Sequence, residues 1–170
     1  MAKVIKPGQR LAESALGFLL RPWLGRAPMA PPEILDSNPE RILLVRAHDM
    51  IGDMIVGTPA FSAIKSLFPR ARLTLVCQPR QEPVVRHHPA LDSVLPFDRR
   101  AVNRSPKEAW RFLRKLRAVG ADGAFVLNTV SFSSSSALVA ALSGARWIVG
   151  GDSGDLGWRF VDWVYSLSLP

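Results

Sequence analysis

The chain has 170 residues, of which 48% are hydrophobic, and its basic residues outnumber its acidic residues by eight. This composition is typical of one folded domain of ordinary size and excludes an intrinsically disordered chain. No apolar run approaches the roughly 18 residues of a membrane-spanning helix. The single cysteine, Cys77, excludes an internal disulfide and a cysteine-only metal cluster, which agrees with a reducing compartment such as the cytoplasm.

The positive charge is concentrated in two segments. Residues 1–30 have a net charge of +4 and residues 99–117 a net charge of +7, whereas the rest of the chain sums to −3. Such patches favour an anionic partner, which can be a phosphorylated ligand, an acidic membrane face or a nucleic acid. We expect no nucleic acid, because no known nucleic-acid-binding module is present.

The first 40 residues are expected to form an extension outside the globular core. Residues 11–20 have the pattern of a short amphipathic helix, and residues 28–39 contain four prolines, which is typical of a linker. The basic flanks of the helix suit peripheral contact with an anionic membrane through residues 1–30. The alternative is that the helix packs on the protein's own surface, and the sequence leaves both open.

Residues 41–170 are expected to form one domain in which strands and helices alternate. Apolar runs, typical of buried parallel strands, predict strands at residues 42–45, 73–77, 93–96, 124–127 and 147–150. Helices are predicted between them at residues 53–67, 82–87, 106–119 and 134–142, and residues 151–170 show no clear period. This order predicts an α/β fold with a mostly parallel, Rossmann-like sheet and right-handed crossovers.

Two of the predicted helices carry local signals. Pro59 lies inside the helix at 53–67 and predicts a late start or a kink. The helix at 106–119 has Ser105 as its expected N-cap and Gly120 as its expected C-terminal glycine. An apolar stripe that begins at Trp110 is expected to face the core, which leaves the basic residues of this helix on its outer face.

Two loops at the carboxyl ends of predicted strands are the candidate sites, because ligands of open parallel sheets bind there. In the first, Gly52 permits close approach of a ligand to the backbone, and Asp53 stands near the start of a helix. Asp53 is either a helix cap or a base that accepts a proton from a substrate hydroxyl. His48 and Asp49 precede this pair but match no metal motif, so we expect no metal.

The second loop follows the predicted strand at 124–127 and is dense in hydroxyl groups. Asn128, Thr129 and Ser131 can hydrogen-bond a sugar or a phosphate, and the amino terminus of the next helix adds a preference for anions. The alternative is ordinary helix capping by one serine, with the others exposed to solvent. The residues do not decide between these two interpretations.

Several segments together resemble glycosyltransferase family 9, the ADP-heptose:lipopolysaccharide heptosyltransferases. The resemblance covers roughly residues 41–157. It rests on the order and spacing of Arg41-Ile-Leu-Leu-Val-Arg46, His48-Asp-Met-Ile-Gly-Asp53, Thr58-Pro-Ala60, Phe68-Pro69, Leu73-Thr-Leu-Val76, Pro89-Ala-Leu-Asp-Ser-Val94, Ala121-Asp-Gly-Ala-Phe-Val-Leu-Asn128, Ser143-Gly-Ala-Arg146 and Ile148-Val-Gly150.

The resemblance implies the GT-B fold, in which two Rossmann-like domains face a cleft. It implies inverting transfer of a heptose from a nucleotide sugar such as ADP-heptose to a phosphorylated lipopolysaccharide-type acceptor, without a cofactor or a required metal. Asp53 would then be the general base. His48, Asp49 and the loop at Asn128 and Thr129 would line the cleft.

The family is about twice as long as this chain, and nothing here resembles its second domain. Residues 41–170 are therefore expected to be the acceptor-side, N-terminal half of a truncated fold. We expect this half to be inactive without a C-terminal domain or a partner chain. A cytoplasmic location is expected, with peripheral contact at the inner face of the inner membrane as its extension. The alternative is a non-catalytic Rossmann-like module that binds a glycan, a nucleotide sugar or another phosphorylated ligand.

Overall fold

The computed structural model describes residues 24–47, 50–127, 134–151 and 163–169. The strands of these segments form one parallel sheet in the order β3-β2-β1-β4-β5-β6, with bounds β1 (Arg41–Arg46), β2 (Arg72–Cys77), β3 (Ser93–Pro96), β4 (Gly123–Val126), β5 (Trp147–Gly151) and β6 (Leu167–Leu169). The helices are α2 (Pro31–Asp36), α3 (Ile51–Leu67), α4 (Glu82–Val85), α5 (Arg99–Arg104), α6 (Pro106–Ala118) and α7 (Ser134–Leu142). The predicted α/β, Rossmann-like fold is confirmed.

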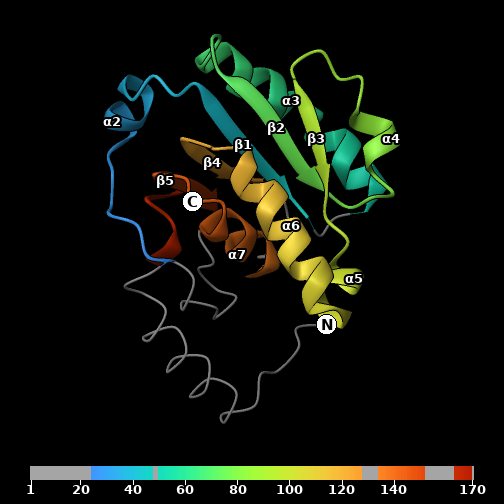
Figure 1. Cartoon of the computed structure of the whole chain (residues 1–170). Coiled ribbons are helices and arrows are strands. Elements are labelled where there is room, and N and C mark those ends of the chain that lie inside the picture. The colour runs from blue at the N-terminus through green and yellow to red at the C-terminus, as the bar shows by residue number, and fades with distance from the viewer. Residues whose placement is uncertain (1–23, 48–49, 128–133, 152–162, 170) are drawn as a thin grey trace, which may run out of the picture.

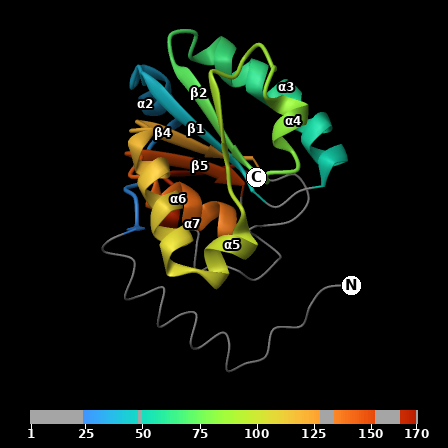
Figure 2. The same ribbon diagram turned by 45° about the vertical axis from the view of Figure 1, so that its right-hand side comes forward.

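Helices cover both faces of the sheet, with α3 and α4 on one side and α6 and α7 on the other (Figures 1 and 2). Alternate residues of β1 enter the two resulting cores. Leu43 and Val45 pack with α6 and α7, whereas Ile42 and Leu44 pack with α3. Because side chains of a strand point alternately to the two faces, a strand covered on both faces needs an unbroken apolar run.

Helix α3 begins at Ile51, two residues before the predicted start, and Pro59 neither delays it nor ends it. Pro59 has no N–H to donate to the carbonyl of Ile55, four residues earlier. The hydroxyl of Thr58 donates to that carbonyl instead, at 2.8 Å. The helix therefore continues through the proline because the adjacent side chain satisfies the exposed acceptor.

The segment before β1, predicted to be a linker, is partly helical and packs on the folded domain. Pro31–Asp36 forms α2, and Ile34 is buried in the core beneath α3. The backbone N–H of Met29 donates to the carbonyl oxygen of Ser166 at 2.9 Å, and this bond holds the segment beside the last strand. The prediction of a linker over residues 28–39 did not include the helix α2, and the amphipathic helix expected at residues 11–20 lies outside the described residues.

Two further elements, α5 and β6, have no counterpart among the predictions. Strand β6 pairs with β5, and Tyr165, just before it, is buried over Gly150. A Cβ atom at Gly150 would collide with the Tyr165 ring, so only glycine permits this close approach. Residues 167–169 of the tail that lacked a sequence period are therefore part of the sheet.

The caps of α6 are confirmed, but its apolar stripe is only partly buried. Ser105 Oγ accepts the N–H of Glu108 at 3.4 Å, and Gly120 takes a positive φ of 60° after the helix. Leu116 is buried, whereas the Trp110 side chain is 64% exposed. The prediction that Trp110 faces the core is wrong, because α5 and α7 leave a groove there.

None of the described helices is long and apolar enough to cross a membrane.

Candidate functional site

The candidate site lies where the sheet changes its winding direction. The chain leaves β1 through α3 toward β2, and it leaves β4, on the other side of β1, through α7 toward β5. Ligands of such sheets bind at the carboxyl ends of the two strands between which the winding direction changes, which are β1 and β4 in this chain. Both loops selected from the sequence start at this edge.

Asp53 occupies the first turn of α3 as its third residue. The N-cap is Met50, whose backbone N–H donates to Asp53 Oδ2 at 3.3 Å. The interpretation of Asp53 as the N-cap itself is thus wrong, although its carboxylate does stabilise the start of the helix. Asp53 is exposed at the carboxyl edge, and so is the neighbouring Gly52, whose Cβ position is open. The carboxylate is therefore accessible to a substrate.

A buried arginine fixes this first turn to the end of β1. Arg46 is only 2% exposed, and its Nη2 donates to the carbonyl of Asp53 at 2.9 Å. Its guanidinium passes beneath Gly57, where a Cβ atom would lie 2.5 Å from Nη1. Gly57 therefore provides the space through which Arg46 reaches Asp53.

Two glutamines after β2 hold both ends of the β1–α3 loop. Gln78 donates through Nε2 to the carbonyl of Ala47 at 3.1 Å, and Gln81 donates through Nε2 to the carbonyl of Met50 at 3.4 Å. Gln81 is fully buried, and its Oε1 accepts the backbone N–H of Gln78 at 2.9 Å. The sequence reasoning missed both residues. The sequence signal that could have identified these glutamines is their position directly after β2, because the carboxyl end of β2 lies at the same edge of the sheet as Asp53.

The second loop approaches the first through Ser136 of α7. The Ser136 hydroxyl is buried and accepts the backbone N–H of Ala47 at 3.4 Å. On the same side, the N–H of Leu127 donates to Val45 at 2.9 Å. The two candidate loops therefore start side by side. Of the predicted site residues, His48, Asp49, Asn128, Thr129 and Ser131 lie outside the described residues.

Cys77 ends β2 near the site but does not supply a nucleophile. Its side chain is buried, and this burial, with a smaller contribution from the negative charge of Glu82, raises the pKa of the thiol to about 12. The thiol thus stays protonated at neutral pH, and the thiolate is the reactive form. Among the described residues, no group of three or more His, Cys, Asp and Glu side chains is placed to hold a metal ion.

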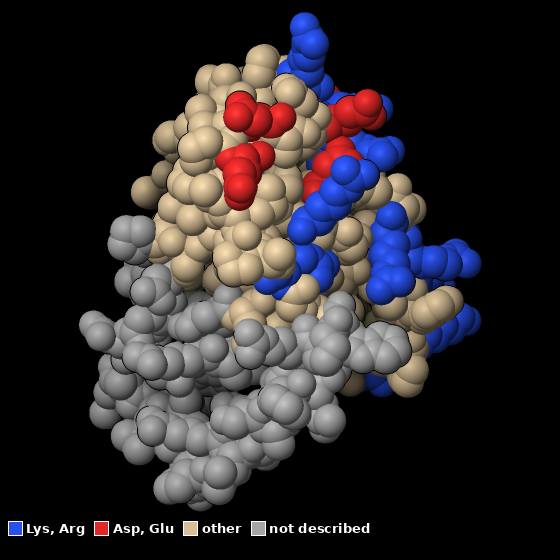
Figure 3. Space-filling model, turned by 90° about the vertical axis from the view of Figure 1, so that its left-hand side faces the viewer, with Lys and Arg blue, Asp and Glu red and all other residues tan. Residues whose placement is uncertain are grey.

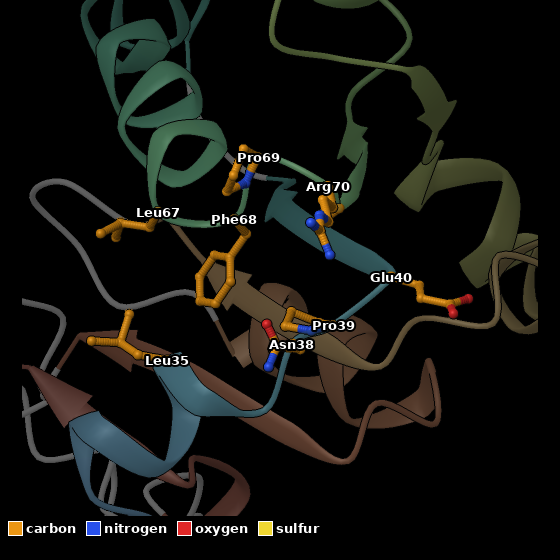
Figure 4. A pocket seen from close by; sticks show the side chains of 9 residues that line it. Leu35, Asn38, Pro39, Glu40, Leu67, Phe68, Pro69 and Arg70 are labelled. Atoms are coloured by element: carbon orange, nitrogen blue, oxygen red, sulfur yellow. The ribbon is translucent and has the colours of Figure 1, made fainter.

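Two pockets lie at opposite edges of the sheet. The pocket in Figure 4, of about 350 Å³, includes Glu40 and Phe68 and lies at the amino end of β1, away from Asp53. The other, of about 440 Å³, lies at the carboxyl ends of β2 and β3, and we call it the arginine pocket after Arg80, Arg99 and Arg100. Gln78 lines it and also contacts the β1–α3 loop. A cationic pocket therefore adjoins the candidate site.

The close contact between Gly57 and Arg46 gives a test of this framework. Replacing Gly57 with Ala is expected to lower the free energy of unfolding by about 1–3 kcal/mol, because the methyl group must displace a buried guanidinium. Alanine at Gly52, in the same helix, meets no atom within 4 Å and is expected to be neutral or stabilising by up to about 1 kcal/mol. Urea denaturation of both variants measures the difference, and equal stabilities would contradict the proposed contact.

The chain is similar in structure to solved glycosyltransferases. A glycosyl transferase of family 9 from Veillonella parvula superposes with a TM-score of 0.62 at 20% identity, over 77% of this chain and 36% of that one. The E. coli heptosyltransferase WaaC, solved with ADP-2-deoxy-2-fluoro heptose, superposes with a TM-score of 0.62 at 19% identity, over 76% and 42%. The E. coli ADP-heptose lipopolysaccharide heptosyltransferase II superposes with a TM-score of 0.54 at 21% identity, over 71% of this chain and 33% of that one.

This chain has the fold of one part of these glycosyltransferases. The resemblance stated from the sequence is confirmed at the level of the fold, although no family model and no curated protein matches the sequence. The chain spans between 33% and 42% of the lengths of these three proteins. It therefore corresponds to a part of them.

Proposed function

We propose that this chain is the acceptor-side part of a glycosyltransferase. The enzyme transfers a sugar from a nucleotide sugar such as ADP-heptose to a lipopolysaccharide-type acceptor. The observation that carries the proposal is the exposed carboxylate of Asp53 at the carboxyl edge, in a chain that superposes on heptosyltransferases over about three quarters of its length. A carboxylate at this position can accept the proton that the acceptor hydroxyl must lose when its oxygen attacks the sugar.

The proposed reaction is a single displacement with Asp53 as the general base. The acceptor hydroxyl transfers its proton to the Asp53 carboxylate while its oxygen forms a bond to the anomeric carbon. The bond from that carbon to the diphosphate oxygen breaks, and the nucleoside diphosphate leaves with the electron pair. Attack from the side opposite to the leaving group inverts the configuration. The Arg46 bond to the Asp53 backbone holds the base in place during this step.

The remaining predicted residues are assigned to substrate binding. His48 and Asp49 come from the β1–α3 loop, Gly52 from the first turn of α3, and Asn128, Thr129 and Ser131 from the loop after β4. The two loops start at the same edge, so they can contact one substrate together. The adjoining arginine pocket suits the phosphates of the acceptor, because guanidinium groups bind phosphate strongly. We propose no metal and no cofactor for the transfer.

The second candidate function is a module that binds a glycan or a nucleotide sugar without transferring it. It is favoured by the span of the chain, which is less than half of each glycosyltransferase that it superposes on. Transfer then requires a second domain or a partner chain that completes the cleft. We accordingly expect little transfer by the 170-residue chain alone.

The two candidates are distinguished by an assay with ADP-heptose and a heptose-free lipopolysaccharide acceptor. The protein encoded by the complete reading frame that contains this chain is expected to transfer the sugar with inversion. NMR of the glycosylated acceptor detects the configuration at the anomeric carbon. The 170-residue chain is expected to show background transfer while still binding the acceptor. Binding without transfer by the complete product would favour the module, and rapid transfer by the 170-residue chain would contradict the expected half-site.

A further inference from the structure

Helices α5, α6 and α7 enclose an apolar groove of about 490 Å³ on the face of the sheet opposite α3 (Figure 2). The side chain of Leu138, in the middle of α7, is 46% exposed in this groove. Large apolar side chains around an open groove are typical of a surface that another segment covers. Its apolar walls are formed by Val102 of α5, by Trp110, Leu113 and Leu116 of α6, and by Leu138 and Leu142 of α7.

The chain reaches one end of this groove at Leu24, the first residue that the structure describes. Leu24 packs on the same core as α6 and α7, and Arg26 donates through Nη2 to the carbonyl of Ala141 at 3.1 Å. Ala141 precedes Leu142, whose side chain lines the groove and whose carbonyl accepts Arg117 Nε at 3.3 Å. The C-terminal ends of α6 and α7 therefore lie together, and the segment before Leu24 starts beside them.

Residues 11–20, outside the described residues, have a sequence that calls for such a surface. With about 3.6 residues per helical turn, Leu16 and Leu19 fall on a broad apolar face, whereas Ser14 and Gly17 fall on the opposite, polar face. A helix of about ten residues is marginally stable in water by itself, so its stability depends on an apolar surface to pack on. The groove is an apolar surface of this kind close to the start of the segment.

The segment also matches the groove in length. Leu20 lies at most about 14 Å from Leu24, four residues later, whatever the path of the chain between them. Ten helical residues extend over about 15 Å. The α6 residues that line the groove, from Pro106 to Leu116, extend over a similar length of about 15 Å. A helix over residues 11–20 can therefore fill the groove from the end at Leu24.

The charges around the groove favour this segment over a second copy of the chain. Residues 99–117 have a net charge of +7, and Figure 3 shows Lys and Arg side chains gathered along the side of the molecule that carries α6. Lys107, in the first turn of α6, is exposed and forms no ion pair with another described residue. Glu13 is the only charged residue within residues 11–20. A second copy would instead bring two segments of net charge +7 together.

We propose that residues 11–20 of this chain dock as a helix in the groove, with their C-terminal end beside the C-terminal ends of α6 and α7. The entry of the chain at Leu24 sets this direction. The apolar face of the segment then covers Leu138. Its acidic residue, Glu13, lies toward the first turn of α6, where Lys107 is exposed. The segment thus completes the core on this face of the sheet.

The test measures how fast a maleimide modifies a thiol placed on the groove wall by Leu138→Cys, in the full 170-residue chain without lipid. Mass spectrometry follows the reaction, and the native Cys77 does not interfere because it is buried. Modification is expected to be slow. Adding Leu16→Asp with Leu19→Asp, which removes the apolar face of the segment, is expected to raise the rate by roughly tenfold or more, because the segment then leaves the groove.

Two controls are matched to this comparison. Ser14→Asp with Gly17→Asp adds the same charge on the polar face of the segment and is expected to leave the thiol on the groove wall protected. Leu67→Cys places a thiol at an exposed position on α3 and should be modified rapidly. That rate should stay the same when Leu16 and Leu19 are replaced. Circular dichroism verifies that each variant is folded.

Three results would overturn the proposal. In the first, the thiol at position 138 is modified rapidly although residues 11–20 are unchanged, which would mean that the groove is open. In the second, the thiol is equally protected when Leu16 and Leu19 are replaced, which would mean that other residues cover it. In the third, protection is lost on dilution of the chain, which would assign the contact to a second copy. None of these measurements involves sugar transfer, so their failure would leave the proposed glycosyltransferase function standing.

Discussion

Replacing Asp53 with Asn is expected to lower the rate of sugar transfer by about 10²–10⁴-fold, which is the range that a positioned general base contributes. The amide has the shape of the carboxylate and can still accept the Met50 N–H, so the start of α3 is retained. It cannot accept the proton of the acceptor hydroxyl at neutral pH. The measurement is turnover with ADP-heptose and acceptor, in the product of the complete reading frame, together with the thermal midpoint of unfolding.

The chain offers a matched control for this substitution. Glu33 is also the third residue of its helix and accepts the N–H of its N-cap, Ala30, at 2.8 Å, but it lies on α2, away from the carboxyl edge. Glu33→Gln is therefore expected to leave turnover unchanged. Asp53→Ala, which removes the cap as well, should cost about 1 kcal/mol of stability in addition to the activity. Unchanged turnover in Asp53→Asn would reduce Asp53 to a helix-capping residue.

Replacing Trp147 with Ala is expected to lower the free energy of unfolding by about 3–5 kcal/mol. The side chain is 2% exposed, and its ring centroid lies 5.4 Å from that of Phe125 and 6.2 Å from that of Phe68. Its indole covers Gly123, where a Cβ atom would collide with it, and its Nε1 donates to Ser37 at 3.2 Å. The substitution therefore removes a contact between the sheet, α3 and the segment after α2.

Urea denaturation and thermal melting followed by circular dichroism measure this effect. A loss of this size corresponds to a decrease of roughly 10 °C in the thermal midpoint of a chain of this length. Trp110→Ala is the control, because it removes the same side chain from an exposed position and should change stability by less than about 1 kcal/mol. Similar losses for the two variants would contradict the burial pattern.

The candidate site depends on contacts between loops as much as on Asp53. Gln78 and Gln81 hold the two ends of the β1–α3 loop, and Ser136 joins it to the helix after β4. Each of these bonds connects residues that are at least 31 positions apart in the sequence. The site is therefore supported by the neighbouring strand and helix on both sides of β1, which favours a preformed binding surface.

Local sequence patterns determined the central architecture. The apolar runs in β1 and β2 indicate strands buried on both faces, because each residue of such a strand enters one of two cores. The caps at Ser105 and Gly120 indicate the ends of α6, because capping is a local interaction. Asp53 was placed near the start of α3 for the same reason. These features depend on residues close together in the chain, so a single sequence reports them.

The tertiary structure decided what depends on residues far apart. Strand β6 forms because β5 offers an edge to pair with, and Gln78, Gln81 and Ser136 gain their roles from partners that no sequence spacing identifies. Trp110 has the periodicity of a core residue, yet it is exposed because α5 and α7 do not fill the space beside it. Periodicity reports which side of a helix is apolar, whereas the packing of the neighbouring elements decides whether that side is covered.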